Sequence, residues 1–130
     1  MSFVPYTGNV TVNGTLTATG NIASTGGNVT AAFGLIAQLG GVDVQSAGQG
    51  LAVKEGANAK QGTAVLVAGT VTVADTSVTA SSRILLTSNA DGGTPGFVRV
   101  SARVAGTSFT ITSSSATDTS TIAFEIFEPG

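Results

Sequence analysis

The first 42 residues contain no Lys, Arg, Asp or Glu, and this constrains the fold more than any other feature of the chain. In this segment a Gly-Asn pair followed by an aliphatic residue recurs at Gly8, Gly20 and Gly27, with Thr alternating against Val, Leu or Ala between the pairs. Such alternation is typical of short β-strands. A water-exposed surface is usually about a quarter to a third charged. We therefore expect other copies of this chain, another protein, or both to cover the segment.

The Asn13-Gly14 dipeptide lies between two of these alternating runs. Both central residues of a type I′ turn need a positive φ, which Asn and Gly tolerate best, so the pattern predicts a hairpin. An isolated hairpin is only marginally stable in water. Its apolar side chains, together with those of the hydrophobic connector that follows, are therefore expected at an oligomer interface: Val10, Val12, Leu16, Ile22, Val29, Phe33, Ile36 and Leu39.

The composition indicates an all-β protein that is not a free-standing soluble monomer. The chain of 130 residues has 20 Thr, 13 Ser and 18 Gly, and Thr and Val dominate the predicted strands. Charged residues make up 9%, against about 25% in ordinary soluble domains. Mean hydropathy is positive, at +0.38, but no run approaches the roughly 20 apolar residues of a transmembrane helix. We therefore expect no membrane partner and assign the low charge to subunit interfaces.

The residue types also argue against catalysis, cofactors and nucleic acid. The chain has no Cys and no His, so it lacks thiolate chemistry, the usual zinc ligands and the usual base of a nucleophilic triad. A net charge of −2 with scattered basic residues disfavours nucleic acid binding. A glycosidase-type pair is conceivable among five carboxylates, but each lies at a predicted turn or strand end: Asp75, Asp91, Asp118, Glu125 and Glu128. The sequence predicts no enzyme, metal or cofactor.

Three domains are expected. Residues 1–30 form an anchoring, trimer-winding β segment, residues 31–60 a connector with short strands at 41–46 and 51–56, and residues 61–130 a head. The arm of Phe3, Val4, Pro5 and Tyr6 is interpreted either as an anchor on a larger assembly or as an edge strand on its own subunit. The head has six strand candidates, at 63–67, 70–73, 83–87, 97–104, 108–112 and 121–127, which predict an antiparallel β-sandwich or jelly-roll-like barrel.

Alternation in two of these strands assigns their faces. Ile122, Phe124 and Ile126 point to one side of the last strand. In the fourth, Val98, Val100, Ala102 and Val104 share one face, and Phe97, Arg99, Ser101 and Arg103 share the other. Arg99 and Arg103 are interpreted either as inter-subunit or partner ion pairs with Glu125 or Asp118, or as a solvated outer face.

The loop Asp91-Gly92-Gly93-Thr94-Pro95-Gly96 resembles a phosphate loop only in its glycines, because neither Lys-Ser/Thr nor a helix follows, so it predicts a hairpin tip. Thr-x-Thr runs at 15–19, 70–72, 110–112 and 119–121 raise the alternatives of glycan or ice binding. Their irregular placement and the β propensity of Thr favour an ordinary strand face.

Two segments resemble proteins of tailed phages. Residues 7–30 are similar to the shaft and collar segments of phage fibres and spikes, in which three chains intertwine. Residues from Gly50 onward closely resemble a module of fibre tips, head fibres and capsid decoration proteins. The matching motifs are Gly62-Thr63-Ala64, Val67-Ala68-Gly69-Thr70-Val71-Thr72-Val73, Thr79-Ala80-Ser81-Ser82-Arg83-Ile84, Gly92-Gly93-Thr94-Pro95-Gly96, Ala105-Gly106-Thr107-Ser108-Phe109-Thr110-Ile111 and Asp118-Thr119-Ser120-Thr121. This resemblance implies a β-sandwich head that trimerises, and implies no activity.

The sequence thus predicts a structural virion protein, a homotrimeric capsid decoration (cement) protein or head fibre that stabilises the shell through its N-terminal region. The expected partner is the major capsid protein or another virion protein. The alternative is a short tail fibre or spike tip that binds a host receptor, with a host glycan as its partner. A bacterial adhesin fragment is a third interpretation, which the lack of a signal peptide disfavours.

Overall fold

The computed structural model describes Asn13 and residues 47–130. The predicted N-terminal arm, the Asn13-Gly14 hairpin, the interface residues between Val10 and Leu39 and the strand at 41–46 lie outside the described residues. In the part that the structure describes, no helix is long and apolar enough to span a membrane.

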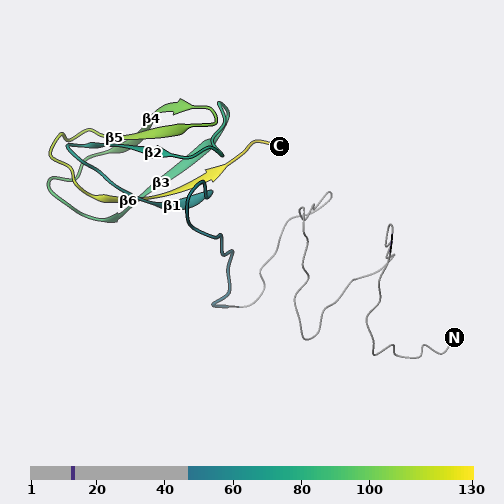
Figure 1. Ribbon diagram of the computed structural model, residues 1–130. Helices are drawn as coiled ribbons and strands as arrows, with labels where there is room; N and C mark the ends of the chain where they lie inside the picture. The colour runs from purple at the N-terminus through teal and green to yellow at the C-terminus, as the bar shows by residue number, and fades with distance from the viewer. Residues whose placement is uncertain (1–12, 14–46) are drawn as a thin grey trace. The chain divides into compact units, whose positions relative to one another are not determined.

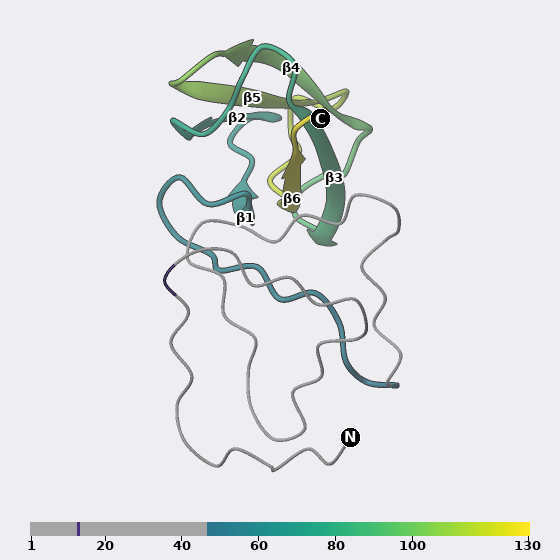
Figure 2. The ribbon, with the colours of Figure 1, turned by 90° about the vertical axis from the view of Figure 1, so that its right-hand side faces the viewer.

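Six strands build two three-stranded antiparallel sheets, which confirms the all-β sandwich (Figure 1). Sheet A has the order β1-β6-β3 and sheet B the order β2-β5-β4, and Figure 2 shows them as two stacked layers. The strands are β1 (Gln61–Val65), β2 (Thr70–Ala74), β3 (Arg83–Ala90), β4 (Val98–Val104), β5 (Ser108–Ser113) and β6 (Thr121–Phe127). The last two strands in the sequence are the central strands of the two sheets.

Most connections between consecutive strands cross from one sheet to the other, and among the six described strands only β4 and β5 pair as sequence neighbours. The link from β1 to β2 shows how a tight turn does this. Ala68 and Gly69 both have positive φ, and Val67 and Thr70 exchange two backbone hydrogen bonds of 2.9 and 3.1 Å. These are the features of a type I′ turn. The predicted turn is therefore present, but the strands that it joins continue into different sheets.

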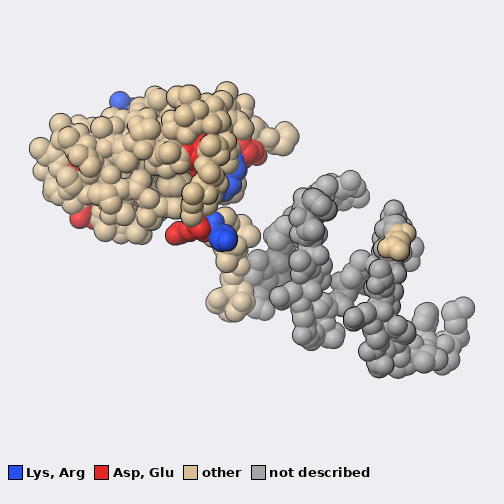
Figure 3. Space-filling view, viewed as in Figure 1, with Lys and Arg blue, Asp and Glu red and all other residues tan. Residues whose placement is uncertain are grey.

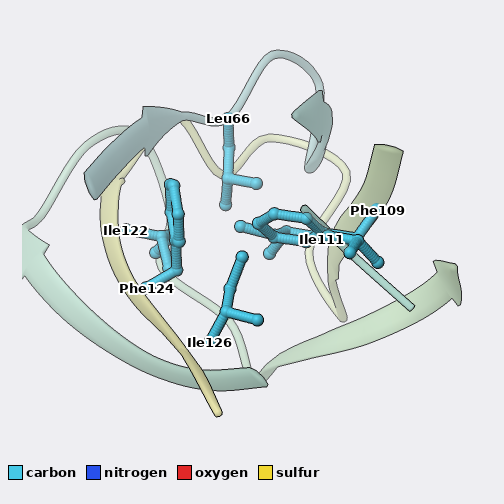
Figure 4. Close-up of a cluster of buried hydrophobic side chains, with 7 residues drawn as sticks. Leu66, Phe109, Ile111, Ile122, Phe124 and Ile126 are labelled. Carbon is cyan, nitrogen blue, oxygen red and sulfur yellow. The ribbon is translucent and has the colours of Figure 1, made fainter. Parts of the chain in front are cut away.

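The core lies between the sheets and is formed by alternate residues of the central strands. Phe109 and Ile111 of β5 face Ile122, Phe124 and Ile126 of β6, as predicted for β6 (Figure 4). Leu66 and Val78 from the connections complete the buried cluster. The Phe109 and Phe124 rings meet edge to face, with centroids 5.1 Å apart at 73°. This geometry is favourable for aromatic pairs and joins the two sheets directly.

A β-bulge in β4 overturns the predicted face assignment of that strand. The register shifts between Val100, which pairs with buried Ile111, and Ala102, which pairs with Thr110 on the outer face. One extra residue reverses the alternation, because side chains in a strand change face at every step. Arg99 pairs with Thr112 but Arg103 pairs with Phe109, so the two arginines lie on opposite faces, and the prediction that they share one is wrong.

Two predicted local elements differ from the structure. Residues 51–56 form no strand. The loop at 91–96 is not a hairpin tip, because β3 and β4 belong to different sheets. This loop instead pairs with the loop before β6, through a bridge between Gly93 and Asp118 and a backbone hydrogen bond from Thr94 to Thr117.

Candidate interaction surfaces

A buried carboxylate, Asp118, holds these two loops together. One of its oxygens, Oδ2, accepts hydrogen bonds from the Ser113 hydroxyl at 2.6 Å and from the Gly96 amide at 2.9 Å. The other, Oδ1, accepts from the Ser120 amide at 2.9 Å. These hydrogen bonds, led by the one from Ser113, hold the pKa of Asp118 well below its usual range. The carboxylate therefore stays ionised and organises the loops.

Glycines allow these loops to approach so closely. Gly93 has a φ of +62°, and a Cβ there would clash with the carbonyl oxygen of Thr117. At Gly92 a Cβ would lie 2.5 Å from the carbonyl oxygen of Thr119, and at Gly96 it would lie 2.5 Å from the Ser113 hydroxyl. The Gly-Gly-Thr-Pro-Gly motif is thus explained by backbone contact.

A second carboxylate, Glu128, fastens the end of β6 to the segment between β2 and β3. Its Oε1 accepts hydrogen bonds from the Lys60 ammonium at 2.7 Å and the Ser82 hydroxyl at 2.6 Å, and its Oε2 accepts from the Thr79 hydroxyl at 2.7 Å. Lys60 also donates to the carbonyl of Ser77 at 2.7 Å. Lys60 and the two hydroxyls lower the pKa of Glu128 from 4.5 to about 2.

Two further carboxylates considered for a glycosidase pair have polar partners of their own. The Asp75 carboxylate, which is buried, accepts from the Ser77 amide at 2.7 Å, and Glu125 accepts from the Gln61 side chain at 2.6 Å. In residues 47–130 no group of three His, Cys, Asp or Glu side chains is placed to hold a metal ion. The contacts of Asp75 and Glu125 thus join them to neighbouring parts of the sandwich.

The outer face of sheet A exposes three large apolar side chains. Val65 of β1, Leu85 of β3 and Phe127 of β6 are between 50% and 57% exposed. Beside them lies a hollow of about 460 Å³, lined by Thr63, Leu85, Thr87, Ala123 and Glu125 among others. Ala123 pairs with Thr63 on one side and Thr87 on the other. Its small side chain leaves room for the hollow in the middle of this face.

The outer face of sheet B carries hydroxyl groups in register. Thr70 of β2 pairs with Thr112 of β5, and Thr72 pairs with Thr110. The hydroxyls of Thr72 and Thr110 lie 3.0 Å apart, and that of Thr112 lies 2.7 Å from the Ser101 hydroxyl at the β4 bulge. Thr70, Thr72, Ser101, Thr110 and Thr112 are called the hydroxyl face below. Two of the four Thr-x-Thr runs therefore lie side by side, a proximity that their spacing in the sequence does not reveal.

An exposed aromatic ring and a guanidinium adjoin the hydroxyl face. Arg99 pairs with Thr112, and Phe97, two residues earlier, is 87% exposed. The strands of sheet B contain Arg99 and Arg103 and no Asp or Glu, whereas those of sheet A contain both Arg83 and Glu125. Most of the visible surface of the sandwich is uncharged (Figure 3).

The structure separates the residues proposed for ion pairs. Arg99 and Arg103 lie on β4 in sheet B, and Glu125 lies on β6 in sheet A. Among the described residues the one ion pair is Lys60–Glu128, at 2.7 Å. Asp118 is 1% exposed and is not accessible to a second subunit. Pairs between Glu125 and the arginines of a neighbouring copy stay a prediction, as do the anchoring and interface residues between Phe3 and Leu39.

Sequence reasoning missed the roles of Asp118 and Glu128. A local signal exists for Asp118, because an Asp that accepts from the amide two residues later is a common turn motif. For Glu128 the partner Lys60 is 68 residues away, so nothing local marks the pair.

The whole sandwich matches one known protein family. Residues 58–127, more than half of the chain and all six strands, match the family described as K1 capsule-specific polysaccharide lyase, C-terminal domain. No curated protein matches the sequence. The family is associated with phage tail spikes, which agrees with the resemblance to phage virion modules. The chain therefore belongs to the family of C-terminal domains of K1 capsule-specific polysaccharide lyases.

Proposed function

We propose that the protein is a non-catalytic structural component of a phage virion, a homotrimer whose β-sandwich projects outward from an N-terminal anchor. The observation that carries this proposal is the family match, because it spans every strand of the described sandwich. The hydrogen-bonded states of Asp118 and Glu128 support it, since both carboxylates act as cross-links between loops.

Within the virion, the tail is the location that the family favours. The name of the family refers to a lyase specific for a capsule polysaccharide, and a protein with that activity works where the particle meets the cell. The present chain would carry the terminal module of such a tail fibre or spike, and its receptor would be a host glycan.

A capsid decoration protein or head fibre is the second candidate, favoured by the 42 uncharged residues at the N-terminal end. Such a segment suits burial on the major capsid protein or another virion protein, with Phe3, Val4, Pro5 and Tyr6 as the anchor. Burial of apolar surface contributes roughly 25 cal/mol per Å², so an extended segment across capsomer joints would stabilise the shell.

For the trimer, we propose that the outer face of sheet A is an interface between sandwiches, in addition to the interface residues between Val10 and Leu39. Val65, Leu85 and Phe127 are half exposed there, and contact with a neighbour would remove them from water. In a cyclic trimer, this face of one copy meets a different surface of the next. Arg103 on the edge strand β4 is suited to pair with Glu125 of that neighbour, which leaves Arg99 beside the hydroxyl face.

The two locations are distinguished by electron microscopy of purified particles labelled with an antibody against the sandwich. Label at the tail supports the fibre or spike, and label spread over the shell supports decoration. Particles without label in either place would contradict the proposal. Free protein added to cells provides a second test, because a receptor-binding tip should block infection whereas a decoration protein should not.

A further inference from the structure

The hydroxyl face is a fixed polar array on a sheet whose strands contain no acidic residue. Strand pairing sets the positions of its threonines, and Thr70 donates a hydrogen bond to the Ile111 carbonyl at 3.1 Å. The Ser101 hydroxyl lies within hydrogen-bonding distance of both the Thr112 hydroxyl and the Thr110 carbonyl. A hydroxyl can donate one hydrogen bond and accept two, so these groups retain capacity for a ligand. A ligand would meet groups that are already oriented.

Two side chains beside the hydroxyl face, Arg99 and Phe97, indicate the chemical class of a ligand that would bind there. A guanidinium pairs with carboxylates in a planar, two-point geometry, and Arg99 lies beside Thr112 with no acidic residue in the strands of its sheet. Phe97, with 87% of its surface exposed, presents an apolar ring at the same end of β4. An aromatic ring on a protein surface covers apolar surface of a bound molecule. Hydroxyls, a guanidinium and a ring together suit a molecule with hydroxyls, a carboxylate and an apolar face.

We propose that the hydroxyl face, with Arg99 and Phe97, binds a carboxylated polysaccharide. Sugar hydroxyls would exchange hydrogen bonds with Thr70, Thr72 and Thr112, and a carboxylate of the polymer would pair with Arg99. The inference rests on the proposed function, since it needs a sandwich that projects from the particle.

Other flat or anionic ligands fit this surface less well. Binding to the phosphates of nucleic acid requires several basic residues, and the strands of sheet B supply two arginines that lie on opposite faces. An ice-binding plane requires many equal repeats, whereas the row after Thr72 and Thr110 changes to Ala74 and Ser108. The array of threonines is therefore two rows deep.

The test is binding of the full chain to immobilised polygalacturonate, alginate and hyaluronan, with carboxyl-reduced polygalacturonate, dextran and duplex DNA as comparisons. The wild-type chain should bind at least one carboxylated polymer and lose affinity as salt increases. Arg99→Gln should weaken binding about tenfold or more, because a charge-assisted hydrogen bond is lost. Phe97→Ala and Thr72→Val should also weaken it.

Lys54→Gln is the matched control, since it removes one positive charge from an exposed residue that lies outside the six strands, and it should leave binding unchanged. The inference is overturned if no carboxylated polymer is bound, if the carboxyl-reduced polymer or DNA binds with equal affinity, or if Lys54→Gln weakens binding as much as Arg99→Gln. A chain that forms trimers and labels the virion but fails these tests would overturn this inference and leave the proposed function intact.

Discussion

At the scale of single residues, a few polar groups in close contact join the loops of the described sandwich. Asp118 accepts three hydrogen bonds, from Ser113 at the end of β5 and from the amides of Gly96 and Ser120 in the two loops, and Gly93 lets the backbones of those loops meet. Glu128 accepts hydrogen bonds from Lys60 and Ser82 and so fastens the C-terminal end of the chain. Aspartate and glycine were predicted at turns from the sequence, but their partners were not, because hydrogen bonds between distant loops depend on the completed fold.

Gly93→Ala tests the close approach of the loops. Gly93 and Gly106 have similar positive φ values, +62° and +68°, but nothing lies near the missing Cβ of Gly106. Gly106→Ala should therefore cost about 1–2 kcal/mol, from backbone conformation alone. Gly93→Ala should cost at least about 1 kcal/mol more, because the new methyl group meets the Thr117 carbonyl. Urea unfolding measures both, and equal costs would show that the loops can move apart freely.

The Glu128 cluster predicts a dependence of stability on pH. The pKa of Glu128 falls from 4.5 to about 2 on folding. The contribution of its ionised carboxylate to stability is therefore complete above pH 4.5 and is lost as the pH falls toward 2. Glu128→Gln should lower the melting temperature at pH 7, and its difference from the wild type should shrink between pH 4.5 and 2. Glu125→Gln, on β6 three residues before Glu128 and outside the cluster, is the control. A difference that stays constant with pH would contradict the assigned role.

At the scale of elements, the type and approximate bounds of the six sandwich strands follow from the sequence, whereas their order does not, and the further strand predicted at 51–56 is absent. Alternation correctly places Ile122, Phe124 and Ile126 inward, because a half-buried strand requires that pattern. The bulge in β4 carries no clear signature, and it reverses the faces of Ala102 and Arg103. The hydroxyl face was missed for the same kind of reason, since pairing β2 with β5 brings together residues about 40 positions apart.

Phe109 joins the two sheets, so its truncation should be severe. Phe109→Ala removes a ring with 0% exposure that contacts Phe124, and should cost about 3–5 kcal/mol. Phe97→Ala removes an equally large but exposed ring and should change stability by less than about 0.5 kcal/mol. Chemical denaturation compares the two variants. If both are tolerated equally, the core between the sheets is not where we place it.

At the scale of the whole molecule, we propose that the N-terminal part of the chain attaches and that the C-terminal sandwich projects. The family match begins at residue 58, so the sandwich is recognisable without the N-terminal part. Removal of residues 1–30 should leave a sandwich with a cooperative thermal transition and abolish attachment to particles. Circular dichroism and co-sedimentation with particles measure the two effects. A truncated chain that still attaches fully would show that the sandwich itself carries the anchor.

Sedimentation velocity of the full chain over a range of dilute concentrations tests the central claim, that this charge-poor chain is a building block of an oligomer. We predict a species of three times 12.7 kDa that persists on dilution. Leu85→Lys on the outer face of sheet A should weaken the trimer, whereas Val104→Lys, on a similarly exposed apolar residue of sheet B, should not. A stable, soluble monomer of the wild-type chain would contradict the account.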